Sequence, residues 1–182
     1  MFGLILNITL AVKVLIIGDS VVFGWDGEHN YPKYVSESGY QVSSLGIPGA
    51  TINQIRAASS SIDSEIRSAD VIIIDAGRNG AYNGENPSDT AQNVRRFAKE
   101  LRGKNKKAYV TASTMIKSKR PEVAAFNKLF NQELMRLESD EFHVDIKFHR
   151  LPDTILSGDN LHPSFEGLRV IAGRVVSFLG GL

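Results

Sequence analysis

The feature that most constrains the fold is the alternation of short apolar runs with amphipathic stretches along most of the chain. Buried strands of a parallel sheet are typically continuous apolar runs. The clearest run is Val71-Ile72-Ile73-Ile74, which is β-branched throughout and is soon followed by Gly77. Five such runs predict strands, over residues 14–17, 40–45, 71–74, 108–111 and 144–148.

Apolar side chains at helical spacing separate these runs and predict four helices. Their stripes cover residues 52–66, 91–101, 123–137 and 165–179. The third stripe begins after Pro121, at a position where proline is favoured in a helix. Alternating strands and helices are typical of a parallel sheet with helices on both faces. We therefore expect an α/β fold, a three-layer α/β/α sandwich around a parallel sheet of about five strands.

The length and composition fit a single domain. The chain has 182 residues, 42% of them hydrophobic, and it shows no internal repeat or low-complexity linker. We predict one domain over residues 13–182, preceded by an apolar N-terminal extension over residues 1–12. That extension lacks the basic start of a signal peptide and is too short to cross a bilayer. The absence of a signal-peptide pattern favours a cytoplasmic location.

Charge and cysteine content exclude several classes of function. The formal net charge is +1, and neutralising phosphate groups requires clustered lysine and arginine, so we expect neither nucleic acid nor membrane as a partner. The chain contains no cysteine, which excludes disulfides, thiol catalysis and thiolate metal sites.

Chemically useful residues follow four of the five predicted strands. Ser20 follows the first strand, Gly49 the second, Asn79 the third, and Asp159 and His162 the fifth. Taken singly, each is ordinary turn or helix-start chemistry. The carboxyl ends of parallel strands meet at one edge of a sheet, where binding sites form. A serine, a histidine and an aspartate gathered there indicate nucleophilic catalysis, because a serine hydroxyl needs a neighbouring base.

In this order, the blocks resemble those of the SGNH hydrolases, also called the GDSL esterase and lipase superfamily, over about residues 14–179. The blocks are Gly18-Asp19-Ser20, Gly46-Ile47-Pro48-Gly49, Gly77-Arg78-Asn79 and Asp159-Asn160-Leu161-His162. The resemblance implies a flavodoxin-like fold and a serine hydrolase that cleaves carboxylic esters without a metal or another cofactor.

The resemblance also implies a role for each residue. Ser20 would attack the ester carbonyl, His162 would take its proton, and Asp159 would orient the imidazole. The backbone N–H groups of Ser20 and Gly49 and the side-chain amide of Asn79 would form the oxyanion hole.

Three positions depart from the family pattern. Gly80 stands where the asparagine block usually continues with an aspartate that braces the loop, so we expect Asn79 to be less firmly held. Ser44 stands where the glycine block usually opens with asparagine, and Ala50 stands where a polar residue is common. None of these changes removes a group that takes part in bond chemistry.

Trp25 and Tyr82 are candidates for substrate contact, since each follows a catalytic block; packing is the alternative for both. The loops after Ser20 and Asn79 are short, which favours an exposed groove and a small-molecule or carbohydrate ester, such as a short-chain or acetyl ester. Three alternatives stay open: a lysophospholipase or thioesterase, an acyltransferase of the same family, and a non-catalytic binding module on the same fold. The oligomeric state is also open.

Overall fold

A computed structural model describes residues 11–182, and its centre is a five-stranded sheet with the strand order β2-β1-β3-β4-β5. Every pair of neighbouring strands is parallel, as the apolar runs predict. The strands are β1 (Lys13–Gly18), β2 (Gln41–Gly46), β3 (Val71–Asp75), β4 (Tyr109–Ser113) and β5 (His143–Ile146).

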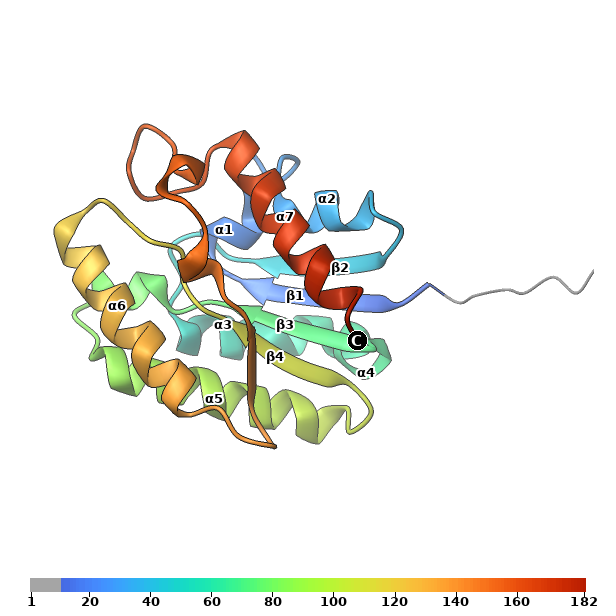
Figure 1. Ribbon diagram of the computed structural model, residues 1–182. Coiled ribbons are helices and arrows are strands. Elements are labelled where there is room, and N and C mark those ends of the chain that lie inside the picture. Colours follow the sequence, from blue (N-terminus) through green and yellow to red (C-terminus); the bar gives the residue numbers. More distant parts are fainter. Residues whose placement is uncertain (1–10) are drawn as a thin grey trace, which may run out of the picture.

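Helices cover both faces of this sheet, which confirms the predicted three-layer sandwich. On one face lie α1 (Ser20–Phe23), α2 (Tyr31–Ser36) and α7 (Phe165–Leu179). On the other lie α3 (Ile52–Ala58), α4 (Asp63–Ser68), α5 (Pro87–Lys104) and α6 (Pro121–Arg136). Figure 1 shows the two layers above and below the central strands.

Side chains of the central strands alternate between the two layers because successive Cβ atoms of a strand point to opposite faces. In β1, Leu15 and Ile17 join the apolar core under α3 to α6, whereas Val14 and Ile16 join the core under α1, α2 and α7. Both faces of the strand are therefore buried, which explains why its sequence is apolar without interruption.

The stripe over residues 52–66 does not form the single helix that its spacing predicts. It divides into α3, a 3₁₀ helix (Ser59–Ile62) and α4. The hydroxyls of Ser59, Ser60 and Ser61 donate to the carbonyls three residues earlier, at 2.7, 3.2 and 2.9 Å. Such side-chain bonds compete with the helical backbone pattern, which accounts for the break.

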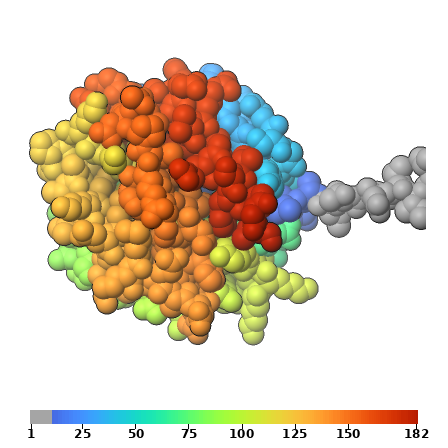
Figure 2. All heavy atoms as spheres, viewed as in Figure 1, coloured from blue at the N-terminus to red at the C-terminus, as the bar shows by residue number. Residues whose placement is uncertain are grey.

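Other differences are small. The fifth strand ends at Ile146, and Phe148 belongs to a short 3₁₀ helix (Phe148–Arg150) instead of the strand. The segment from the end of α6 to the start of α7 fills the space between these two helices on the face shown in Figure 2. No helix within residues 11–182 combines the length and the apolar character needed to cross a membrane.

The predicted extension, residues 1–12, lies outside the described residues except for its last two. There the carbonyl of Val12 accepts a hydrogen bond from the Gln41 N–H at 3.1 Å, just ahead of the paired part of β1 and β2.

The strand order reverses between β1 and β3. The chain leaves β1 toward β2 on one side and later returns to β3 on the other. Binding sites of open α/β sheets form beyond the carboxyl ends of the strands at such a switch point.

Candidate active site

Ser20 lies at this switch point as the first residue of α1, and only Asp19 separates it from the end of β1. Asp19 caps the short helix, since its carboxylate accepts a hydrogen bond from the Val21 N–H at 3.1 Å. The cap fixes the turn between strand and helix, so that the position of the Ser20 side chain is set by the fold and not by a mobile loop.

A chain of hydrogen bonds connects the predicted serine, histidine and aspartate. Ser20 Oγ lies 3.1 Å from His162 Nε2, and His162 Nδ1 lies 2.7 Å from Asp159 Oδ2. Both distances are within hydrogen-bonding range. The structure therefore brings Ser20 to Asp159 and His162, which lie more than 130 positions further along the sequence.

Asp159 is held by several donors at once. Its Oδ1 accepts from the N–H groups of Leu161 and His162, both at 2.9 Å, and from the Ser157 hydroxyl at 2.7 Å. Partial burial raises the pKa of this carboxyl, but the hydrogen bonds, those from His162 foremost, outweigh burial and hold the pKa below its ordinary range. Asp159 is therefore ionised at neutral pH.

The loop after β4 supports the Asp159 loop from outside. The Lys119 N–H and the Ser118 hydroxyl donate to the carbonyl of Asn160, at 3.0 and 3.1 Å, and Arg120 Nε donates to the carbonyl of Asp159 at 3.1 Å. Asn160 has a φ of 60°, a left-handed conformation that asparagine tolerates better than most residues. These contacts hold the tight turn between Asp159 and His162.

The two other predicted residues, Gly49 and Asn79, border the same site. Gly49 has a φ of 74°, which favours glycine. Asn79 Nδ2 donates to the carbonyl of Ala50 at 3.0 Å, so its amide is tied to the Gly49 loop, although Gly80 provides no side chain beside it. An amide NH₂ group has two hydrogens, and this bond uses only one of them.

A cleft of about 510 Å³ opens at this point. It is within the usual size range of small-molecule sites. Ser20, Gly49, Asn79 and His162 all line it, while Asp159 lies behind His162. Its walls are mostly apolar and are formed by Val21, Phe23, Trp25, Pro48, Tyr82, Leu161, Pro163 and Leu168.

Trp25 and Tyr82 both lie where substrate contact was expected. They are 46% and 49% exposed, and both line the cleft. Trp25 Nε1 donates to the carbonyl of Pro163 at 2.8 Å, and its ring meets the His162 ring edge-on at 5.8 Å. The Tyr82 hydroxyl accepts from Arg120 at 3.3 Å. Each ring therefore has a fixed polar end and an open apolar face.

Sequence reasoning missed two features of the site. Phe23 is a further aromatic residue in the wall of the cleft, and Arg78, next to Asn79 in the sequence, is buried. Arg78 lies within the Gly77-Arg78-Asn79 block, so its charge next to a predicted site residue was the available signal. Within residues 11–182, no group of three or more histidine, aspartate or glutamate side chains is arranged to hold a metal ion.

The fold and the site define a flavodoxin-like α/β/α protein with a serine, a histidine and an aspartate in hydrogen-bonding contact at the switch point. Residues 16–170 match the sequence model of the GDSL-like Lipase/Acylhydrolase family, and the chain belongs to this family. It is therefore a carboxylic ester hydrolase.

Solved structures share the fold across nearly the whole chain. The lipase/acylhydrolase from Enterococcus faecalis is 20% identical, with a TM-score of 0.78 over 93% of this chain and 96% of that one. The esterase EstA from Pseudoalteromonas sp. is 16% identical, with a TM-score of 0.75 over 93% and 97%. A carbohydrate esterase of family 3 from Talaromyces cellulolyticus is 17% identical, with a TM-score of 0.68 over 93% and 97%. No curated protein sequence matches the chain.

Proposed function

We propose that the protein hydrolyses its ester by an acyl-enzyme mechanism with Ser20 as nucleophile, His162 as general base and Asp159 as the group that orients the imidazole. The observation that carries the proposal is the continuous chain of contacts, 3.1 Å from Ser20 to His162 and 2.7 Å from His162 to Asp159, opening into an apolar cleft. A base within hydrogen-bonding reach of a hydroxyl, itself oriented by a third group, is the arrangement that activates a serine.

The reaction proceeds in two halves. Ser20 Oγ bonds to the ester carbonyl carbon as its proton passes to His162 Nε2, and His162 then protonates the leaving alcohol as the ester C–O bond breaks. A water molecule attacks the acyl-enzyme in the second half, giving up its proton to His162, and Ser20 leaves with that proton. Acid and alcohol are released, and the enzyme is unchanged.

Three N–H donors would stabilise the negative oxygen of each tetrahedral intermediate. They are the backbone N–H groups of Ser20 and Gly49 and the second amide hydrogen of Asn79. Neither backbone N–H has a protein acceptor within the described residues, 11–182. Losing one donor of this kind costs about 100- to 1000-fold in turnover.

For the substrate, we propose a short-chain acyl ester or an acetyl ester of a carbohydrate. The half-exposed rings of Trp25 and Tyr82 provide flat apolar faces beside the nucleophile, with polar ends that are already hydrogen-bonded. Aromatic side chains of this kind suit ligands that are partly apolar and partly wet. The carbohydrate esterase among the structural relatives has the same fold.

One observation favours a second candidate, an ester with a longer acyl chain. The cleft wall beyond Ser20 is formed by Val21, Phe23, Leu161 and Leu168, and a methylene group buried against such a wall gains about 0.8 kcal/mol. The same apolar wall would therefore contact either a short or a long acyl chain.

Initial rates on acetyl and decanoyl esters of one alcohol test the proposal, with Ser20→Ala as the control. We expect the wild-type protein to prefer the acetyl ester in kcat/KM and the variant to lose at least about 1000-fold on both substrates. A clear preference for decanoyl would assign the second candidate. Undiminished activity of Ser20→Ala would exclude the acyl-enzyme mechanism.

A further inference from the structure

Arg78 is a buried cation directly beside a residue of the proposed oxyanion hole. Its side chain is only 4% exposed, whereas the next residue, Asn79, lines the cleft. Arginine is almost never fully buried unless it is paired. The chemistry proposed above uses neither Arg78 nor the carboxylates around it.

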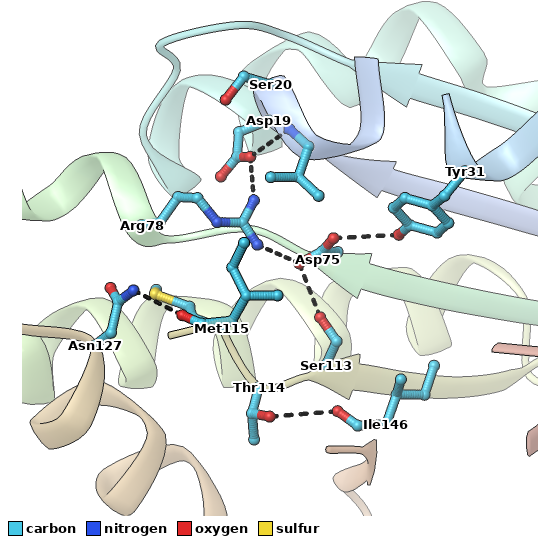
Figure 3. A network of polar contacts seen from close by, with 12 residues as sticks. Asp19, Ser20, Tyr31, Asp75, Arg78, Ser113, Thr114, Met115, Asn127 and Ile146 are labelled. Carbon is cyan, nitrogen blue, oxygen red and sulfur yellow. Dashed lines mark hydrogen bonds and ion pairs between the residues drawn. The ribbon is translucent and has the colours of Figure 1, made fainter. Parts of the chain in front are cut away.

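The Arg78 guanidinium joins the ends of two strands (Figure 3). One terminal nitrogen, Nη1, pairs with Asp19 Oδ1, and the other, Nη2, lies 2.6 Å from Asp75 Oδ1. Asp19 directly precedes Ser20, and Asp75 is the last residue of β3. A planar guanidinium presents its donors in a fixed fork, so both contacts together fix its orientation as well as its position.

Both carboxylates have further partners. Asp75 accepts from the Ser113 hydroxyl at 2.9 Å and from the Tyr31 hydroxyl at 3.2 Å, and Asp19 accepts from the Val21 N–H at 3.1 Å. The network therefore attaches Arg78 to β1, β3, β4 and α2.

The charges of the network depend on one another. Burial lowers the pKa of the Arg78 guanidinium, but Asp19 and Asp75 outweigh burial and raise it, so Arg78 remains a cation. Burial raises the pKa of Asp19, against the opposing effect of Arg78. Within residues 11–182, Asp19 Oδ2 and Arg78 Nε have no hydrogen-bond partner. Compared with apolar side chains packed in the same place, buried ion pairs of this kind add little to the free energy of unfolding. Their main effect is therefore on the positions of the residues that they join.

Apart from Arg78, the turn that carries Asn79 is hydrogen-bonded mainly to the segment that follows it, since the carbonyls of Asn79 and Gly80 accept from residues 82, 83 and 85. Residues 78–81 form one 3₁₀ turn, closed by a bond from the Gly80 N–H to the Gly77 carbonyl at 3.0 Å. A Cβ at Gly80 would lie 2.8 Å from the Phe126 ring and 2.9 Å from the Glu85 carboxylate, so these side chains would have to shift to accommodate a larger residue. The Asn79 amide is tied by one bond to Ala50.

We propose that Arg78 is a positioning residue that fixes the Asn79 amide relative to Ser20 by tying the Asn79 turn to the ends of β1 and β3. The inference rests on the proposed function, in which Asn79 stabilises the oxyanion. Arg78 itself touches neither substrate nor reacting atoms.

A double-mutant cycle between Arg78→Lys and Asn79→Ala tests this inference. Lysine keeps the buried charge but cannot span both carboxylates with a fork. We expect Arg78→Lys to lower kcat about 10- to 100-fold with KM within about twofold, and Asn79→Ala to lower kcat about 100- to 1000-fold. In the Asn79→Ala background, Arg78→Lys should change kcat by less than about threefold, because a residue that acts through Asn79 has nothing left to position.

Two variants make the test independent of folding losses. Arg56→Lys is the matched control, because Arg56 pairs with Glu100 at 2.9 Å away from the site, and its kcat should not change. Tyr31→Phe removes one hydrogen bond to Asp75 with little change in volume. It should lower kcat about two- to tenfold, again only when Asn79 is present, even if Arg78→Lys does not fold.

The proposal would be overturned if the loss of kcat in the double variant equalled the product of the losses in the two single variants. A wild-type kcat in Arg78→Lys would also overturn it, as would a wild-type kcat in Tyr31→Phe if Arg78→Lys is unfolded. If Asn79→Ala alone had no effect on kcat, the oxyanion role of Asn79 would fail, and the Arg78 proposal would fail with it. Labelling of Ser20 by a phosphonate would still report separately on the nucleophile.

Discussion

At the scale of single residues, the Asp159 carboxylate is the most constrained group of the site. It accepts hydrogen bonds from two backbone N–H groups, the Ser157 hydroxyl and the His162 ring. The short spacing from Asp159 to His162 lets one turn provide both the imidazole and its partner, so no additional loop is required. The bond to Nδ1 leaves Nε2 as the nitrogen that faces Ser20.

Asp159→Asn should lower kcat about 10⁴-fold with little change in KM, because an amide in this place favours the wrong imidazole tautomer.

Asp159→Asn should also lower the free energy of unfolding, by an amount that depends on pH. The pKa of Asp159 is depressed in the folded state, so its stabilising effect is fully present above the ordinary carboxyl value of about 3.9 and is lost as the pH falls below that value. Urea unfolding of both proteins at pH 7 and pH 3 measures this effect. A stability difference that grows toward pH 3 would contradict it.

At the scale of elements, the glycine loop depends on the start of α3. Thr51 caps this helix in a capping box: the Thr51 N–H donates to Gln54 Oε1 at 2.8 Å, and Thr51 Oγ1 accepts from the Gln54 N–H at 3.5 Å. The cap begins two residues after Gly49, so the helix holds the end of the loop that presents the Gly49 N–H.

Thr51→Ala should lower the free energy of unfolding by about 1 kcal/mol, because it leaves an N-terminal N–H of the helix without its cap. Thr154→Ala is a matched control, since Thr154 is exposed and has no cap role, and should change the stability by less than about 0.5 kcal/mol. Equal effects of the two substitutions in urea unfolding would show that the capping box adds no stability.

The sequence predicts elements and site to different extents. The hydrophobic pattern alone was sufficient to predict the strands β1 and β3 and the helices α5, α6 and α7. Burial of strands within the sheet, and of one helix face against it, dictates both kinds of pattern. The short helices α1 and α2 were not expected, because four to six residues are too few to show a helical period. The serine-rich break after α3 was also missed, since periodicity ignores side-chain bonds to the backbone.

Among the site residues, the strand ends placed Ser20, Gly49 and Asn79 on one rim, because parallel strands share an edge. The Arg78 network could not be predicted in this way. Its partners Asp19, Asp75 and Tyr31 come from three separate segments, and only the packed structure brings them together.

At the scale of the whole molecule, one sheet with two apolar layers holds the four loops of the site at a single edge. This arrangement supports the proposal that residues 13–182 form one domain. Under the proposed function, a chain with a net charge of only +1 would recognise its substrate through a cleft with mostly apolar walls and a few N–H donors, and not through a long-range electrostatic field.

The most direct test of the central claim is labelling of the purified protein with a fluorophosphonate, followed by intact mass and peptide mapping, beside Ser20→Ala. A serine activated by His162 attacks such a probe and keeps it as a stable adduct. We predict a single adduct on Ser20 that is absent from Ser20→Ala. A folded protein that forms no adduct, or that forms it on another residue, would contradict the assignment of Ser20 as the nucleophile.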